Sequence, residues 1–115
     1  MSDANEILNI DGVEYHLDSN GYLLSARSWS REFCEFMAAR EGLALENAHW
    51  QVVGMVRAYY ARYDDSPPMR ALVKLVAKEL GTEKANSRYL YKLFPDGPGK
   101  QASLLAGLPK PVSCI

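Results

Sequence analysis

The sequence predicts an α+β fold, with one β-hairpin at the N-terminus and helices along the rest of the chain. Two short β-prone runs, residues 7–10 and 13–17, flank Asp11-Gly12, the dipeptide that suits a two-residue type I′ turn. From residue 29 onward, apolar side chains recur at helical spacing between capping residues, glycines and prolines. The chain has 115 residues, 48% of them hydrophobic and 23% charged, which is typical of a single globular domain.

The first two helices are expected at residues 29–41 and 47–63. Ser28 is the predicted N-cap of the first helix, and Gly42 lies near its end. The second helix has a broad apolar face that includes His49. A histidine on such a face is usually a core residue with one hydrogen bond rather than a metal ligand, and we predict that role for it.

Two further helices are expected at residues 68–80 and 83–94, and a last short helix at 98–106. Proline in the first turn opens the third helix, Gly81 is its predicted C-cap, and Thr82 is the predicted N-cap of the fourth helix. Each of these two helices carries three basic residues at a spacing of four: Arg70, Lys74 and Lys78 on the third, and Lys84, Arg88 and Lys92 on the fourth.

The net charge of −1 conceals an uneven distribution. Residues 1–66 hold 11 acidic and 5 basic side chains, whereas residues 67–115 hold 3 acidic and 8 basic ones. A basic half favours an acidic protein surface or a nucleic acid as partner. The alternative is that the basic rows are merely solvated helix faces.

Several classes of protein are excluded by what the sequence lacks. No apolar run approaches the roughly 20 residues of a membrane span, and the first residues show no secretion signal, so we expect a cytoplasmic protein. The two cysteines and two histidines have no metal-ligand spacing, so we expect no metal and no cofactor. The run Gly97-Pro98-Gly99-Lys100 lacks the full spacing of a phosphate-binding loop.

The last nine residues differ from the rest and end with a cysteine in the penultimate position. Gly107 stops the preceding helix, and Pro109 and Pro111 favour an extended path. At ~3.1 Å per residue, Cys114 could reach roughly 20 Å from a body formed by residues 1–106. We therefore predict a single domain in which residues 107–115 are a mobile arm, and we expect deletion of residues 108–115 to leave the thermal stability nearly unchanged.

The two cysteines are expected to differ in reactivity. Cys34 lies at the flank of the apolar face of the first helix, which predicts partial burial and a structural role. Cys114 lies in the arm, where a thiol has no strong activation of its own and would depend on the site of a partner. The alternative is that Cys114 is an incidental thiol at a frayed end.

The run from Gln101 to Pro111, followed by the penultimate Cys114, resembles the C-terminal arm of the TusE/DsrC family. The similarity covers nearly the whole chain. It includes the Asn9–Gly12 turn, Gly21-Tyr22-Leu23, His49-Trp50, Tyr59-Tyr60, the Pro68-x-Arg70 opening and the run from Asn86 to Pro95.

This resemblance implies a β-hairpin packed on an orthogonal helical bundle, with a helix-turn-helix-like pair and a flexible C-terminal arm. It also implies a sulfur relay in which Cys114 carries sulfur as a persulfide. The DsrC proteins tied to dissimilatory sulfite reduction have a second arm cysteine, eleven positions before the penultimate one. That position is Ser103 in this chain, which favours the TusE branch, whose members serve 2-thiouridine formation on tRNA.

The resemblance also suggests partners. The donor would be a TusBCD-like sulfur-transfer complex, and the acceptor a tRNA-thiolating enzyme with bound tRNA. The expected docking residues are the basic ones: Arg70, Lys74, Lys78, Lys84, Arg88, Lys92 and Lys110.

Two alternatives remain. The third and fourth helices with their Gly81 turn could form a helix-turn-helix module that binds nucleic acid. The chain could also be an accessory subunit of a sulfite reductase, although Ser103 argues against that role.

Overall fold

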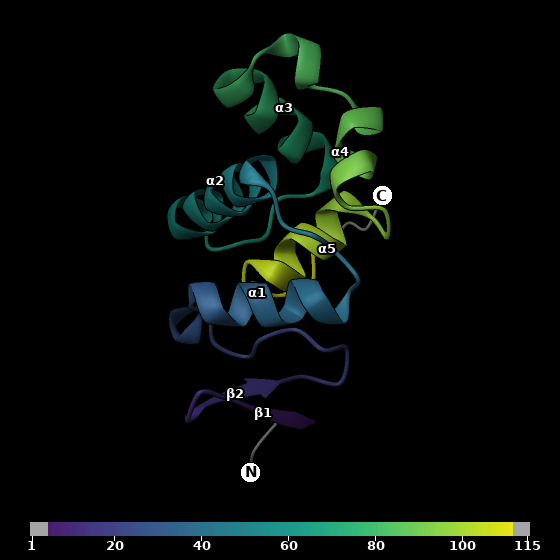
Figure 1. The fold of residues 1–115 in the computed structure, drawn as a ribbon. Helices are drawn as coiled ribbons and strands as arrows, with labels where there is room; N and C mark the ends of the chain where they lie inside the picture. The colour runs from purple at the N-terminus through teal and green to yellow at the C-terminus, as the bar shows by residue number, and fades with distance from the viewer. Residues whose placement is uncertain (1–4, 112–115) are drawn as a thin grey trace.

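The computed structural model describes residues 5–111 and shows a two-stranded hairpin followed by helices (Figure 1). The strands are β1 (Glu6–Ile10) and β2 (Val13–Leu17). The helices are α1 (Arg31–Arg40), α2 (Asn47–Tyr63), α3 (Met69–Leu80), α4 (Ser87–Leu93) and α5 (Pro98–Leu105), and the 3-10 turns are η1 (Ala26–Ser28) and η2 (Thr82–Lys84). The expected α+β class is confirmed.

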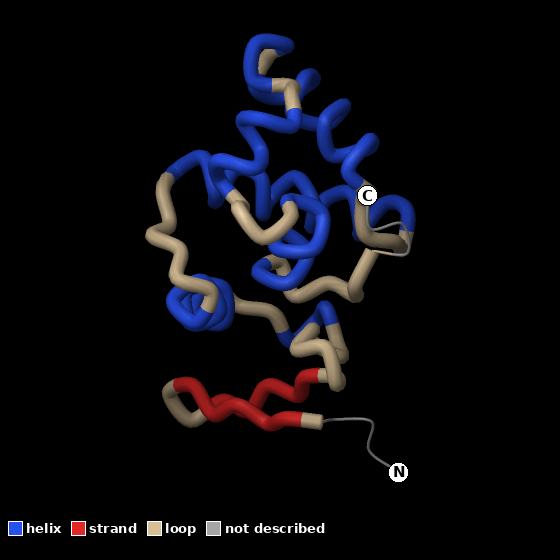
Figure 2. The backbone as a smooth tube through the Cα atoms, turned by 90° about the vertical axis from the view of Figure 1, so that its right-hand side faces the viewer, coloured by secondary structure: helices blue, strands red, loops and turns tan. Residues whose placement is uncertain are grey.

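The hairpin has the turn that its sequence predicts. Its strands pair antiparallel, and the two turn residues, Asp11 and Gly12, have positive φ angles of 52° and 85°. A type I′ turn requires positive φ at both central positions, so Asp-Gly suits it. The hairpin forms one end of the molecule (Figure 2). Its Tyr15 ring lies 5.1 Å from the ring of Phe33 in α1, which joins the hairpin to the helices.

Helix α1 starts later than the sequence suggested. Ser30, not Ser28, is its N-cap, and the Ser30 hydroxyl accepts a hydrogen bond of 3.0 Å from the Phe33 N–H. The same hydroxyl lies 2.7 Å from the Tyr15 hydroxyl of the hairpin. Both serines are suitable caps by type, and the contact with the hairpin favours Ser30. Gly42 follows the end of the helix, as predicted, with a φ of 75°.

The fourth helix is shorter than expected. Its N-cap is Asn86, whose side-chain oxygen accepts a 2.8 Å hydrogen bond from the Tyr89 N–H, and Thr82 instead begins the 3-10 turn η2. An extended asparagine with a free side-chain acceptor is a stronger start signal than a threonine four residues earlier. Lys84 therefore lies in η2, and only Arg88 and Lys92 of the predicted basic row share α4.

Helix α2 matches its predicted bounds and buries His49. The His49 Nδ1 accepts from the Glu46 N–H at 3.1 Å, and its Nε2 donates to the Leu93 carbonyl at 2.8 Å. These two bonds require the neutral ring with its proton on Nε2. The predicted structural role is confirmed, with two hydrogen bonds instead of one.

Helix α5 lies at the centre of the molecule. It contacts α1, α2, α3 and α4, and every residue from Gln101 to Leu108 is buried (Figure 1). The chain beyond α5 thus leaves from the middle of the fold rather than from its edge. Within residues 5–111, every helix falls short of the length or the hydropathy that a bilayer-spanning helix requires.

Candidate functional site

Cys114 lies outside the described residues, and the structure shows the segment that leads to it. We call residues 107–111 the arm root. At its start, the Gly107 N–H donates to the Leu104 carbonyl at 3.3 Å, and the Leu108 N–H donates to the Ser103 carbonyl at 3.0 Å. This pair of bonds is the Schellman motif, which needs a left-handed residue after the C-cap. Gly107 supplies it with a φ of 70°.

Two side chains from distant parts of the sequence hold the end of α5. The Trp29 indole N–H donates to the Leu105 carbonyl at 2.8 Å, and the Arg57 guanidinium donates to the Ala106 carbonyl at 2.8 Å. The guanidinium lies 4.3 Å from the centre of the Trp29 ring, and burial lowers the pKa of Arg57 below its usual value. A cation at the carboxyl end of a helix is favourable because the free carbonyls carry partial negative charge.

The arm root is packed against the body. The Leu108 side chain is 1% exposed, and Pro111 is also buried. The Ser66 hydroxyl, in the loop between α2 and α3, donates a 2.6 Å hydrogen bond to the Pro109 carbonyl. We expected the body to end at Ala106, but the packing continues to Pro111. The apolar Leu108 side chain and the Ser66 hydroxyl are the reason.

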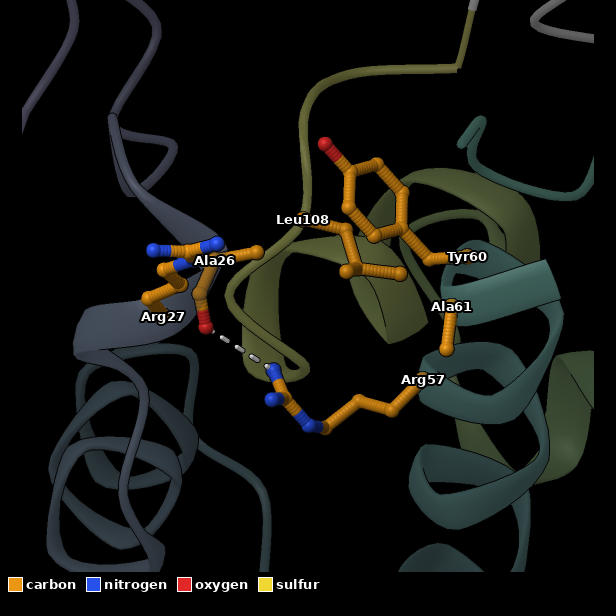
Figure 3. A pocket seen from close by; sticks show the side chains of 6 residues that line it. All are labelled: Ala26, Arg27, Arg57, Tyr60, Ala61 and Leu108. Carbon is orange, nitrogen blue, oxygen red and sulfur yellow. Dashed lines mark hydrogen bonds between the residues drawn. The ribbon is translucent and has the colours of Figure 1, made fainter. Parts of the chain in front are cut away.

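A pocket borders the arm root (Figure 3). It lies between η1 and α2 and has a volume of about 390 Å³. The Arg57 guanidinium crosses it to reach the Ala26 carbonyl at 3.4 Å. Its lining residues are Ala26, Arg27, Arg57, Tyr60, Ala61 and Leu108.

Cys34 is fully buried in α1, where we had expected partial burial. Burial, with a smaller contribution from Glu35, raises the pKa of its thiol from 9.0 to about 12, and Arg31 opposes this shift. Because the thiolate is the reactive form, a thiol with so high a pKa is inert at neutral pH. The structural role predicted for Cys34 agrees with this environment.

The basic residues predicted to dock partners are all exposed. Arg70, Lys74 and Lys78 share α3 at the predicted spacing, whereas Lys84 lies in η2, 6.0 Å from the ring of Tyr89. Lys110 belongs to the arm root. None of the seven lines the pocket beside Leu108.

The residues that hold the arm root were not predicted from the sequence. Trp29 fell within the helix expected at residues 29–41, and Arg57 and Ser66 were not singled out. The sequence around each of the two polar residues, Arg57 and Ser66, has one unusual local feature. Arg57 is a charged residue beside the buried Val56 of α2, and Ser66 directly precedes two prolines in a loop. Neither signal shows that its partner is a backbone carbonyl more than forty residues away.

The fold and the site define a small α+β protein whose central C-terminal helix leads into a fixed segment followed by a cysteine-bearing terminus. The family model described as "DsrC like protein" matches residues 9–115. The chain belongs to the DsrC-like family.

Relatives and solved structures of this family are similar over nearly the whole chain. Sulfurtransferase TusE of Sodalis glossinidius (strain morsitans) is 50% identical over 108 residues, which covers 94% of this chain and 100% of the relative. The sulfurtransferase TusE homolog of Haemophilus influenzae is 49% identical over 109 residues, with 95% and 100% covered. The solution structure of Allochromatium vinosum DsrC is 43% identical with a TM-score of 0.86, and it covers 100% of both chains. The oxidised gamma-subunit of the dissimilatory sulfite reductase (DsrC) from Archaeoglobus fulgidus is 36% identical with a TM-score of 0.84, and 96% of this chain and 100% of that one are covered.

Proposed function

We propose that this protein is a cytoplasmic sulfur carrier that holds sulfur as a persulfide on Cys114. The observation that carries the proposal is its identity of about 50% with proteins named as TusE sulfurtransferases, over their full length. This similarity supports a sulfur-relay role. The family match extends to residue 115 and therefore includes Cys114.

The chemistry of the step is a redox-neutral exchange between thiols. The Cys114 thiolate attacks the outer sulfur of a donor persulfide and forms a new S–S bond. The S–S bond of the donor breaks, and its own sulfur leaves with the electron pair as a thiolate. The thiolate of the acceptor then attacks the outer sulfur of the Cys114 persulfide in the same way, and the Cys114 sulfur leaves with the electron pair as a thiolate. No oxidant or reductant is consumed.

The environment of the other cysteine supports Cys114 as the carrier. Cys34 is buried and its thiol pKa is about 12, so it offers neither access nor thiolate at neutral pH. The sequence contains two cysteines in total. This contrast supports Cys114 as the residue that carries sulfur.

The donor we propose is a TusBCD-like complex, and the acceptor is an enzyme that thiolates the wobble uridine of tRNA. Both solved structures described above are DsrC proteins, and one of them is the gamma-subunit of a dissimilatory sulfite reductase. Ser103 favours the first pair of partners, because a serine cannot form the second sulfur bridge that the resemblance associates with sulfite reduction. The exposed basic residues on α3 and α4 favour acidic surfaces on the partners or the tRNA itself.

The test compares Cys114→Ser with Cys34→Ala, both in the full chain. Each protein is incubated with cysteine and a cysteine desulfurase in the presence of a TusBCD-type donor, and its mass is measured without reduction. We expect the wild type and Cys34→Ala to gain one sulfur atom and Cys114→Ser to gain none. Cells that lack the native chain but express Cys114→Ser should lose 2-thiouridine. Normal 2-thiouridine levels in those cells would contradict the proposal.

A further inference from the structure

We propose that the pocket beside the arm root is a docking site for an acidic segment of a partner protein, in which Arg27 and Arg57 bind a carboxylate. The pocket lies between η1 and α2 and has a volume of about 390 Å³. This inference goes beyond the proposed sulfur relay, because it assigns a binding surface and holds whether or not Cys114 carries sulfur. It also differs from the docking surface expected on α3 and α4, since no basic residue of those helices lines the pocket.

The lining of the pocket is positively charged. Two of its six lining residues are arginines, and none of the six is acidic. Arg27 is exposed on η1, and Arg57 reaches the pocket from α2 on the opposite side (Figure 3). The two ion pairs within residues 5–111 lie in the hairpin and between the hairpin and α1. Neither pocket arginine therefore has a carboxylate partner in that part of the chain.

Arg57 has hydrogen-bond donors that its backbone contacts do not use. Its Nη1 atom donates to the Ala106 carbonyl at 2.8 Å and to the Ala26 carbonyl at 3.4 Å. The N–H groups of Nη2 and Nε have no acceptor within residues 5–111. In that range, Ser103 Oγ is the only side-chain nitrogen or oxygen that is both fully buried and without a partner. The unused N–H groups of Arg57 are therefore accessible to a ligand.

The environment of Arg57 favours a carboxylate as its ligand. The side chain is partly buried, and burial lowers its pKa because the charged form has lost part of its hydration. A carboxylate beside the guanidinium restores this stabilisation through charge-assisted hydrogen bonds, which are about twice as strong as neutral ones. The Nη2 and Nε groups lie on one edge of the guanidinium, and paired N–H groups of this kind match the two oxygens of a carboxylate.

The rest of the lining suits a peptide segment rather than a nucleic acid. Ala26, Ala61 and Leu108 contribute apolar walls, and Tyr60 adds a ring and a hydroxyl. Apolar walls with a few placed polar groups are typical of ligand sites, whose volumes are roughly 300–1,000 Å³. A nucleic-acid backbone instead needs several cations along successive phosphates, and the basic rows of this chain lie on α3 and α4. Because Leu108 belongs to the arm root, a segment in the pocket also contacts the base of the arm.

NMR titration of the ¹⁵N-labelled full chain tests this assignment. The probe is a short, terminally blocked peptide of sequence glycine–leucine–glutamate–leucine–glycine, and the control peptide has glutamine in place of glutamate. The indole N–H signals of the two tryptophans are internal reporters. The Trp29 ring lies 4.3 Å from the Arg57 guanidinium at the pocket. Trp50 is the control, because its ring lies 4.1 Å from the Arg31 guanidinium and neither residue lines the pocket.

We expect the glutamate peptide to shift the Trp29 indole signal and the amide signals of Arg27 and Arg57, while the Trp50 indole signal stays unchanged. The glutamine peptide should bind about tenfold more weakly, because it cannot form the charged pair. Equal binding of the two peptides would overturn the proposal. So would equal shifts from inorganic phosphate at the same concentration, or shifts confined to α3 and α4. A Trp29 shift that depends on protein concentration without peptide would indicate a second copy as the occupant, and it would also overturn the proposal.

Arg27→Gln and Arg62→Gln are a matched pair of variants. Both remove one positive charge from an exposed side chain, but Arg62 lies on α2 outside the pocket lining, 5.5 Å from the Tyr63 ring. We expect Arg27→Gln to weaken binding of the glutamate peptide about threefold, as for an exposed ion pair, and Arg62→Gln to leave it unchanged. Equal weakening in both variants would indicate a general attraction of anions and would contradict the assignment, as would unchanged binding in Arg27→Gln. None of these measurements involves sulfur, so their outcome is independent of the role of Cys114.

Discussion

The substitution Leu108→Ala tests directly whether the arm root belongs to the folded body. The Leu108 side chain is 1% exposed and loses three carbon atoms in this change. At about 0.8 kcal/mol per buried CH₂ group, the lost burial amounts to ~2.4 kcal/mol. The pocket next to Leu108 lets its neighbours relax, so the added cost of a cavity is small. We expect the free energy of unfolding to decrease by about 2–3 kcal/mol.

Urea denaturation followed by circular dichroism measures this change, and Lys110→Ala is the matched control two residues further along the arm root. Lys110 is exposed, so its replacement should alter the free energy of unfolding by no more than about 0.5 kcal/mol. Thermal melts should show a decrease of roughly 10 °C in Tm for Leu108→Ala alone. If both variants stay within about 0.5 kcal/mol of the wild type, the arm root is a free tether, as the sequence first suggested.

Three further predictions test other features of the structure. Gly107→Ala should destabilise the fold by about 2–5 kcal/mol in urea, because φ is positive there and the new Cβ would lie 2.7 Å from the Trp29 Cδ1 atom; a neutral effect would contradict this. Because Asn86 is the N-cap of α4, Asn86→Ala should lower the free energy of unfolding by ~1 kcal/mol, and Thr82→Ala should lower it by about 0.5 kcal/mol or less. A larger effect of Thr82→Ala would instead favour the helix over residues 83–94 that the sequence predicted. The pKa of the Cys34 thiol is raised to about 12 in the folded protein. The unfolded chain therefore loses the thiol proton from pH ~9 upward, whereas the folded chain keeps it until about pH 12. The free energy of unfolding should consequently fall as the pH rises from 9 to 12. Cys34→Ala should flatten that decline between pH 8 and 10.5, and an identical pH dependence would refute the assignment.

Elements defined by local signals were predictable from the sequence. Helix α2 has the bounds that its apolar spacing suggested, and Asp11-Gly12 forms the expected turn of the hairpin. In both cases the residues that determine the structure are neighbours in sequence. Turn chemistry and helical periodicity report on such neighbours directly.

Features that depend on distant contacts were not predictable in the same way. Ser28 and Ser30 are equally good caps by residue type, and the hairpin residue Tyr15 makes the difference. The arm root looked like a free segment because prolines and a glycine weaken local structure. Its attachment comes from Ser66, 43 residues away from Pro109, and the sequence contains no local sign of that contact.

The position of Ser103 bears on whether sulfur is passed to another protein or held in a bridge within the chain. Its carbonyl accepts the hydrogen bond from Leu108 that closes the end of α5, and its side chain is fully buried. This is the position where the resemblance places the second cysteine of proteins that form an internal sulfur bridge. The Ser103 side chain is fully buried in the last turn of α5 and has no access to solvent in this structure. A serine at this position forms no sulfur bridge, so the exchange of sulfur with other proteins that we propose above requires no opening of this turn.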